Sequence, residues 1–198
     1  MLITIILISC LLIFTALYLF FNKKGFNNRV LSAFEQLSAT MNLENASVQR
    51  MPSLSLTGTY RTFDIVIECS PKKVNGKRRE GWRFTTTLPR PAVCRFYIQG
   101  EGSEGRLTKV IDLDVVTTDD ALFDNQVLLF SSCKETAKRV WTPYLRQRFI
   151  STDMNDFSME VLGDEAAFEL NIEPLASVRQ IRRALEAWVE FLNIVAVI

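Results

Sequence analysis

The sequence predicts an α+β fold in which an N-terminal transmembrane helix precedes a mainly antiparallel sheet of about eight strands, packed with three to four helices. Three observations predict it. Met1–Phe21 contains no charged residue, no Pro and no Gly. The chain from Leu54 to Ile172 then holds short stretches of alternating apolar and polar residues separated by turn signals. Amphipathic helical patterns flank these strands, at Asn27–Leu43 and after Pro174.

Met1–Phe21 is predicted to be a membrane anchor. An α-helix rises about 1.5 Å per residue, so roughly 20 residues cross a hydrocarbon core about 30 Å thick. A cleaved signal peptide would need a basic start, a shorter apolar core and a small-residue cleavage site, and none is visible. Leu7-Ile8-Ser9-Cys10 resembles a lipoprotein cleavage site. However, apolar residues follow it and no basic residue precedes it, which argues against a lipoprotein.

The charges after the anchor predict its orientation. Lys23, Lys24 and Arg29 follow the apolar run, and positive flanks stay on the cytoplasmic side. We therefore expect a single-pass protein with its N-terminus outside, a juxtamembrane linker at 22–28 and a cytoplasmic domain at 29–198. Beyond the anchor the chain has three cysteines, Cys69, Cys94 and Cys133, without C-x-x-C spacing, which does not indicate a disulfide framework.

The first half of the domain is predicted to be one helix followed by strands. In Asn27–Leu43, apolar residues recur at helical spacing. The predicted strands are Leu54–Thr59, Thr62–Cys69, Trp82–Leu88, Cys94–Ile98, Ile111–Val115 and Val127–Phe130. Asn75-Gly76 is a strong hairpin turn signal. Pro89 and Pro91 predict a second hairpin between Trp82–Leu88 and Cys94–Ile98.

The second half is predicted to contain two short helices, a hairpin and a final helix. Ser132-x-x-Glu135 reads as a capping box, and Thr142-Pro143 as the N-cap and first position of the next helix. Gly163-Asp164 is a two-residue turn between Phe157–Val161 and Ala166–Ile172. Pro174 begins the last helix, which runs to about Asn193.

The last helix carries an apolar seam with spacings of three and four residues. Two interpretations stay open: the seam covers the sheet, or it pairs with a helix of another subunit. The seam, and so the possible partner-helix face, consists of Val178, Ile181, Leu185, Trp188, Leu192 and Val195.

Charge is unevenly distributed along the chain. Residues 22–109 carry 15 Lys and Arg against 7 Asp and Glu, and residues 110–198 carry 8 against 15. Either the basic half faces the anionic inner leaflet, or the two halves attract each other within the fold. The predicted membrane-surface cations are Lys23, Lys24 and Arg29, with Lys72, Lys73, Lys77, Arg78 and Arg79 around the Asn75-Gly76 turn. A solvated loop tip is the alternative; nucleic-acid binding is not expected, because aromatic residues rarely interleave with these cations.

No constellation of catalytic residues is recognisable. The chain has no His, which excludes Ser-His-Asp and Cys-His catalysis and His-ligated metals. The aspartates between Asp112 and Asp124 do not follow EF-hand spacing and are interpreted as turn and cap residues. Gly100–Gly105 matches G-x-G-x-x-G, but a β-like segment follows it, so we interpret it as a loop. No catalytic, cofactor-binding or metal-binding residue and no cofactor is predicted.

Three stretches carry a resemblance. They are Leu56-x-Gly58-x-Tyr60, the segment Thr117–Asp124 and the segment Trp141–Leu145. They are similar to a loose group of uncharacterised bacterial membrane proteins in which a single membrane helix precedes a cytoplasmic α+β domain. Asp119 stands where that pattern has Gly. The resemblance implies a bacterial source, and it implies no activity.

These observations favour a non-catalytic interaction or accessory module of a bacterial inner-membrane assembly. Its expected partners are the lipid bilayer and one or more membrane-complex proteins, including a second copy of itself, and no nucleic acid. Two alternatives remain: a sensor of anionic lipid that works through the basic hairpin, and an enzyme that uses Asp, Lys and Arg without His.

Overall fold

The computed structural model describes residues 15, 24–50, 54–74, 76–103, 112–152, 154–173 and 178–197. Within these ranges, no helix combines the length and the apolar character needed to cross a membrane. Apart from Thr15, the predicted anchor Met1–Phe21 lies outside them. The first long described helix spans 24–41, so residues 24–28, predicted as linker, are helical, Gly25 included.

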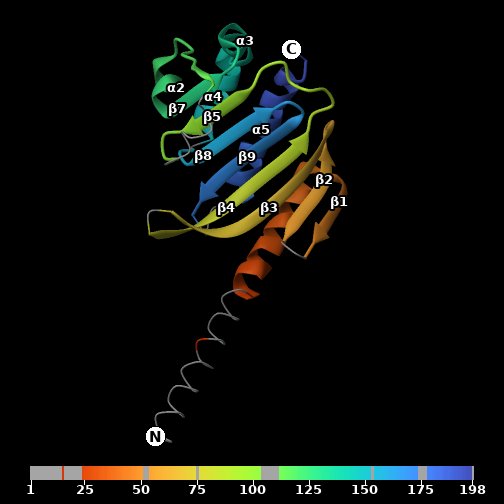
Figure 1. Ribbon diagram of the computed structural model, residues 1–198. Coiled ribbons are helices and arrows are strands. Elements are labelled where there is room, and N and C mark those ends of the chain that lie inside the picture. Colours follow the sequence, from red (N-terminus) through yellow and green to blue (C-terminus); the bar gives the residue numbers. More distant parts are fainter. Residues whose placement is uncertain are drawn as a thin grey trace, which may run out of the picture.

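Nine strands in the described part of the chain form one antiparallel sheet, one more than the approximate number expected. Its spatial order is β1-β2-β3-β4-β9-β8-β5-β7-β6 (Figure 1). The strands are β1 (Glu44–Gln49), β2 (Ser55–Tyr60), β3 (Phe63–Val74), β4 (Lys77–Thr87), β5 (Phe96–Gly100), β6 (Asp114–Val115), β7 (Val127–Ser131), β8 (Phe157–Leu162) and β9 (Glu165–Ile172). With the 24–41 helix, the described helices are α2 (Ala121–Gln126), α3 (Lys134–Val140), α4 (Pro143–Ser151) and α5 (Val178–Val195).

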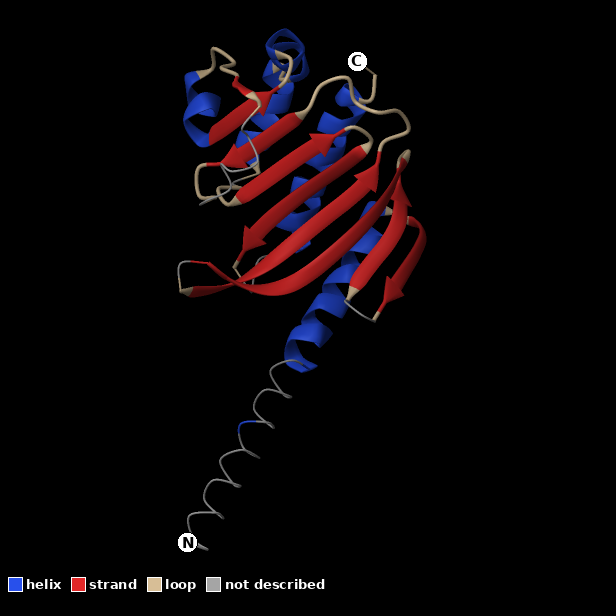
Figure 2. Ribbon diagram, viewed as in Figure 1, coloured by secondary structure: helices blue, strands red, loops and turns tan. Residues whose placement is uncertain are grey.

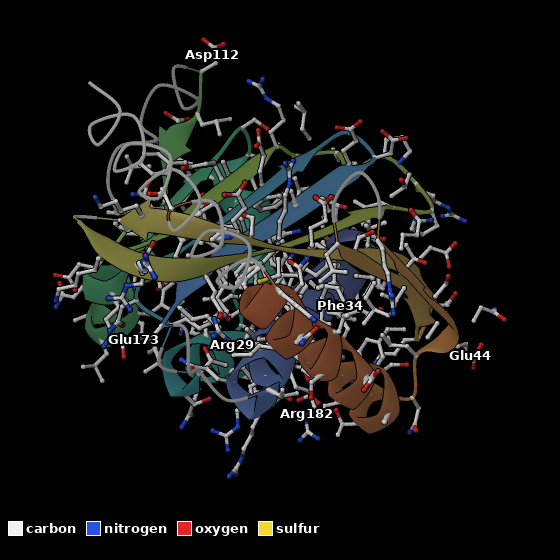
Figure 3. All side chains as sticks on the ribbon, turned by 90° about the horizontal axis from the view of Figure 1, so that it is seen from below. Arg29, Phe34, Glu44, Asp112, Glu173 and Arg182 are labelled. Carbon is white, nitrogen blue, oxygen red and sulfur yellow. The ribbon has the colours of Figure 1, made fainter. Side chains whose placement is uncertain are left out.

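The 24–41 helix and α5 lie against one face of the sheet and bury its apolar side (Figures 2 and 3). Strand residues alternate between faces, and in β3, β4, β8 and β9 the residues on one side are apolar and buried. Phe34 meets Trp82 of β4 edge to face, with ring centroids 5.8 Å apart. Trp188 of α5 contacts Phe84 and Phe168 at 6.3 and 6.2 Å. These rings join both helices to the centre of the sheet.

The apolar seam of α5 belongs to this core. Ile181, Leu185, Trp188, Leu192 and Val195 are buried, and Val178 packs against the same cluster while remaining partly exposed. Ala184, Val189 and Phe191 are buried with them. The stripe is therefore wider than a coiled-coil seam, as expected for a helix that covers a sheet. Five of the six residues proposed as a partner-helix face are therefore buried within this chain, and Val178 is partly buried against the same core.

The predicted hairpin between Trp82–Leu88 and Cys94–Ile98 is wrong. Strand β4 pairs with β3 and β9, whereas β5 pairs with β7 and β8. The β8–β9 hairpin is inserted between them, and the 88–95 connection passes over its turn. Leu88 N–H donates to Asp164 O at 2.7 Å and Ala92 N–H to Gly163 O at 2.8 Å. The two prolines mark this crossing connection, because proline interrupts strands without specifying which strand comes next.

The predicted capping box is also wrong, whereas the following cap is confirmed. Cys133 is the N-cap of α3 and makes no side-chain capping bond. Ser132 Oγ instead accepts the N–H of Arg95 at 2.9 Å. Thr142 caps α4 by accepting from the N–H of Leu145, and Pro143 occupies the first turn. The Gly163-Asp164 turn is confirmed as the two-residue link between β8 and β9, with Leu162 opposite Glu165.

Three elements differ from the sequence expectation in extent. The edge strand β1 was not predicted, and all six of its residues are exposed. The one-turn helix α2 was not predicted either, and buries only Phe123. Of the expected strand Ile111–Val115, the described part contributes only Asp114–Val115, and Val115 is exposed.

Candidate functional site

The sheet face opposite the helices is covered by no described helix (Figure 2). We call it the open face. The pairing register aligns one row of its residues across the sheet from β2 to β6: Thr57, Val66, Thr85, Ala167, Glu160, Tyr97, Phe130 and Val115. Thr85 and Ala167 in the middle of this row are small, whereas Tyr97 and Phe130 toward its β6 end are large, so the middle of the face is lower than its β5–β7 end.

A shallow hollow of about 720 Å³ lies at this low centre. Thr85 and Ala167 form its floor, and Val66, Arg83, Glu160 and Leu162 stand around it. Asp64 and Glu165 add two more carboxylates, so its described lining carries three acids and one base. Leu162 is half exposed. The hollow is thus an acidic surface with an apolar rim.

Charged residues beside the hollow are arranged in opposite-sign pairs. Arg83 of β4 lies directly between Glu68 of β3 and Glu169 of β9 in the register. Lys72 Nζ reaches Glu169 at 3.2 Å. Its side chain crosses above Gly81, where an added Cβ would lie 2.6 Å from the Lys72 carbons. These pairs hold the face in a defined shape, and each adds about 0.2–1 kcal/mol to sheet stability.

The far end of the open face is apolar. Tyr97 and Phe130 lie with ring centroids 6.2 Å apart and pack with the partly buried Leu113. Leu128 and Val115 beside them are exposed. The open face therefore changes from acidic at its centre to apolar at the β5–β7–β6 end.

The basic segment predicted as a loop forms the end of the β3–β4 hairpin. Lys72 pairs with Arg79, Lys73 with Arg78 and Val74 with Lys77 in the strand register, so the cations lie on two paired arms. Gly76 occupies the turn with φ +77°. Arg79 forms an ion pair with Glu173 at 3.3 Å, and Lys72 is held by Glu169.

Three cations remain at the hairpin tip. Lys73, Lys77 and Arg78 are exposed and have no acidic partner among the described residues. We call these three the tip cations. In Figure 1 the tip lies at the same lower side of the domain as the beginning of the 24–41 helix. The predicted hairpin is thus present. Of its five cations, Lys72 and Arg79 form ion pairs within the domain, and the tip cations do not among the described residues.

The cations nearest the predicted anchor differ from one another. Lys23 lies outside the described residues, and Lys24 is exposed. Arg29 Nη2 lies 3.5 Å from Glu80 Oε1 on the covered side of the sheet. Burial raises the pKa of Glu80, and Arg29 opposes that rise by charge and hydrogen bond. Arg29 therefore has a structural partner inside the domain.

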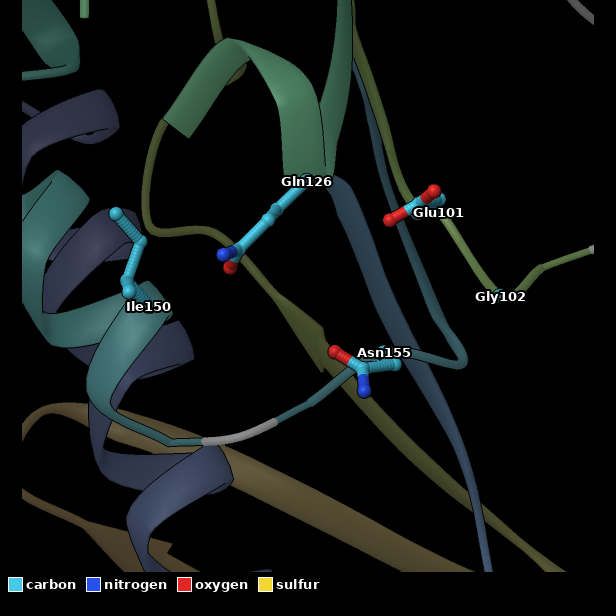
Figure 4. Close-up of a pocket in the computed structure, with 5 residues that line it drawn as sticks. All are labelled: Glu101, Gly102, Gln126, Ile150 and Asn155. Carbon is cyan, nitrogen blue, oxygen red and sulfur yellow. The ribbon is translucent and has the colours of Figure 1, made fainter. Parts of the chain in front are cut away.

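A second hollow, of about 620 Å³, is polar and lies near the glycine-rich loop (Figure 4). Glu101, Gly102, Gln126, Ile150 and Asn155 line it. Gly102 N–H donates to Asn155 O at 2.7 Å, and a Cβ at Gly102 would approach that oxygen to 2.8 Å. This close backbone approach explains the glycine. Among its described lining residues only Glu101 is titratable, which does not suit acid–base catalysis.

The aspartates after Asp112 serve mainly as caps and ties. Asp120 caps α2 by accepting from the N–H of Phe123, and its Oδ2 lies 3.1 Å from Arg146 Nε. Asp124 accepts from both the N–H and the hydroxyl of Thr118. Within the described ranges, no three Asp, Glu or Cys side chains gather as metal ligands would.

Sequence patterns did not reveal the hollow on the open face. Its floor depends on Thr85 and Ala167 being neighbours, and they lie on strands far apart in the sequence. The available signal was the two small polar residues Thr85 and Thr87, which the alternation placed on the solvent side of one strand.

Comparisons with known proteins identify a solved structure with a similar fold. No protein-family model matches the chain, and none of the curated proteins matches it. A solved structure, the mycobacterial trehalose monomycolate transport factor A, TtfA, is similar with a TM-score of 0.57 and 11% sequence identity. The match covers 86% of this chain and 94% of that one. At this identity the likeness shows that the two chains share an α+β fold.

Proposed function

We propose that this chain is a non-catalytic accessory module of a bacterial inner-membrane assembly, anchored by Met1–Phe21 with the domain on the cytoplasmic side. The observation that carries the proposal is the open face, a broad sheet surface covered by no described helix. One end bears exposed Leu128 and Val115, and the centre is an acidic hollow with Leu162 at its rim. Such a surface suits a protein partner with a complementary basic and apolar patch.

The shared fold supports the accessory part of the proposal. The similar chain is described as a transport factor, and its match extends over most of both chains. A fold hosts many functions, so this support is by analogy. The open face supplies the physical argument, because it offers a partner a large surface with an acidic centre and an apolar end.

Purification of the full-length chain in mild detergent from its own cells tests this proposal. We expect a partner in stoichiometric amount, identified by mass spectrometry. Changing Val66 and Leu162 to Arg places two charges at the hollow and should release the partner. Leu122→Arg and Tyr144→Arg are matched controls, because both residues are exposed and lie on helices. A monomer without a stoichiometric partner, or equal retention by both sets of variants, would contradict the proposal.

A second candidate function is favoured by the tip cations. Three exposed cations on one hairpin tip, at the same side as the start of the 24–41 helix, could contact anionic headgroups at about 1 kcal/mol each. In nanodiscs, backbone amides at 70–80 should exchange more slowly with anionic lipid than with neutral lipid. Changing Lys73, Lys77 and Arg78 to Glu should remove the difference. The same reversal at Arg61, Arg90 and Lys138 should preserve it.

A further inference from the structure

Two of the three cysteines beyond the predicted anchor lie side by side in the fold. Cys94 belongs to the connection before β5, and Cys133 follows β7. Both are thiols in this structure; Cys94 is buried and Cys133 is partly buried. They are 39 positions apart in the sequence, and no spacing rule would join them.

The register of β5 and β7 brings the pair together. Phe96 lies opposite Ser131. The pairing continues one step further, because Ser132 N–H donates to Arg95 O at 3.1 Å and Arg95 N–H donates to Ser132 Oγ at 2.9 Å. Cys94 and Cys133 are the next residues along the two segments, just beyond the ends of β5 and β7. Since alternate residues share a face, both thiols fall on the covered side with Phe96 and Ser131.

This position suits a cross-strand disulfide. Two hydrogen bonds between Arg95 and Ser132, one of them to the Ser132 hydroxyl, hold the two backbones together next to Cys94 and Cys133. Directly opposed residues of antiparallel strands have Cα atoms about 4.5–5.5 Å apart. Disulfides join residues whose Cα atoms lie about 4.4–6.8 Å apart. The pKa of the Cys94 thiol is raised, first by burial and then by the neighbouring Cys133 side chain, while Thr136 opposes the rise.

We infer that Cys94 and Cys133 form a redox-active pair, which closes into an intramolecular disulfide on reaction with a disulfide-bearing oxidant such as oxidised glutathione. The Cys133 thiolate, the more exposed of the two, attacks one sulfur of the oxidant and expels one thiolate. The Cys94 thiolate then attacks Sγ of Cys133 in the mixed disulfide and expels the second. The chain loses two protons and two electrons, and the oxidant gains them as two thiols.

The disulfide would tie the 88–95 connection to the start of α3, a crossing that the sheet otherwise holds by few hydrogen bonds. In a reducing compartment the pair stays reduced until oxidants accumulate. Cys69 is the internal contrast. It lies buried on β3 opposite Trp82, and burial, with a smaller effect of Glu80, raises the pKa of its thiol. The inference does not depend on the proposed function, since it needs neither the anchor nor a partner.

Thiol trapping of the full-length chain in mild detergent tests the pair. The chain is equilibrated in glutathione buffers from reducing to oxidising, quenched in acid, denatured, alkylated and mapped by mass spectrometry. We expect Cys94 and Cys133 to lose alkylation together and to appear in one cross-linked peptide, while Cys69 stays alkylated. Amides at 92–95 should exchange more slowly after oxidation.

Two matched variants test which cysteines form the cross-link. Cys69→Ser should keep the cross-link, and Cys133→Ser should abolish it while leaving Cys94 alkylated. Glutathione adducts that persist on Cys133 without a cross-link would overturn the inference. Disulfides between two chains, or a cross-link that includes Cys69, would overturn it as well.

Discussion

Arg29 on the 24–41 helix and Glu80 on β4 form an ion pair, 3.5 Å between Nη2 and Oε1, that joins the first helix to the sheet. The Glu80 side chain is almost fully buried, whereas that of Arg29 is half exposed. The carboxylate therefore loses most of its hydration, and the guanidinium keeps much of its own. Burial accordingly raises the pKa of Glu80, and Arg29 limits the rise.

The first prediction concerns pH. Because the folded-state pKa of Glu80 is raised, the folded chain binds more protons than the unfolded chain between the ordinary and the raised value. Glu80 therefore lowers the free energy of unfolding as pH rises through that window. Arg29→Met should cost about 1–3 kcal/mol at pH 7, because it leaves a buried carboxylate unpaired. The cost should shrink toward pH 4, where Glu80 is protonated.

Urea unfolding of the full-length chain in mild detergent, from pH 4 to pH 8, measures this. Glu80→Gln should flatten the pH dependence, and adding Arg29→Met to it should cost less than Arg29→Met alone. Arg29→Lys keeps the charge and serves as the control. A cost of Arg29→Met that does not change with pH would show that packing, and not the carboxylate, is responsible.

The second prediction concerns the aromatic core. Trp188 contacts Phe84 and Phe168, and its Nε1 is buried without a partner in the described part of the chain. Trp188→Ala should lower the free energy of unfolding by about 3–5 kcal/mol. Trp188→Phe should cost under about 1.5 kcal/mol, because it retains most of the packing and removes the unpaired N–H.

The same urea titration checks the core prediction against an exposed position. Val66→Ala on the open face should change stability by no more than about 0.5 kcal/mol. If Trp188→Ala cost as little as Val66→Ala, α5 would not be held against the sheet as described.

Elements with a strong local pattern were predictable from the sequence. The 24–41 helix buries Val30, Phe34, Leu37 and Met41, which recur at the helical spacing that predicted a helix in Asn27–Leu43. The β8–β9 turn and the Thr142 cap follow from local backbone chemistry, because Gly tolerates positive φ and Thr can accept a backbone N–H. The exposed edge strand β1 and the one-turn α2 lack any periodic buried side, so no such signal existed.

Which strands lie next to each other in the sheet could not be predicted in the same way. Alternation tells which face a residue occupies, but not which strand lies beside it. The alternation of Trp82 and Phe84 is compatible with either β5 or β9 as the neighbouring strand, and in the structure the neighbour is β9, about 80 residues further along the chain. The hollow on the open face and the Cys94–Cys133 pair both arise from register, and for that reason both escaped the sequence analysis.

A third prediction compares two glycines. Gly163 has φ +62° in the β8–β9 turn, so Gly163→Ala should destabilise the protein by about 1–2 kcal/mol. Gly25 lies in the 24–41 helix with nothing within 4 Å of an added Cβ. Gly25→Ala should stabilise by about 0.5–1 kcal/mol. Thermal unfolding should show shifts of opposite sign, and shifts of the same sign would contradict the assigned backbone conformations.

A fourth prediction concerns Thr118, which is held from both sides. Asp124 accepts its N–H at 3.0 Å and its hydroxyl at 2.8 Å, and Arg146 donates to its carbonyl at 3.1 Å. Asp124→Ala leaves the N–H and hydroxyl unpaired and should cost about 1–3 kcal/mol. Thr118→Val removes only the hydroxyl bond and should cost about 1 kcal/mol. Asp112→Ala, at an exposed position, should be nearly neutral.

Hydrogen exchange distinguishes this tie from a metal site. In Asp124→Ala the Thr118 amide should exchange faster, whereas in Thr118→Val it should stay protected, because its bond to Asp124 remains. Adding Mg²⁺ or Ca²⁺ to the wild-type chain should leave the exchange unchanged, since the Asp124 oxygens are already engaged by Thr118. Cation-dependent protection at this amide would instead mean that the aspartates bind metal, and the interpretation of Asp124 as a structural tie would have to be abandoned.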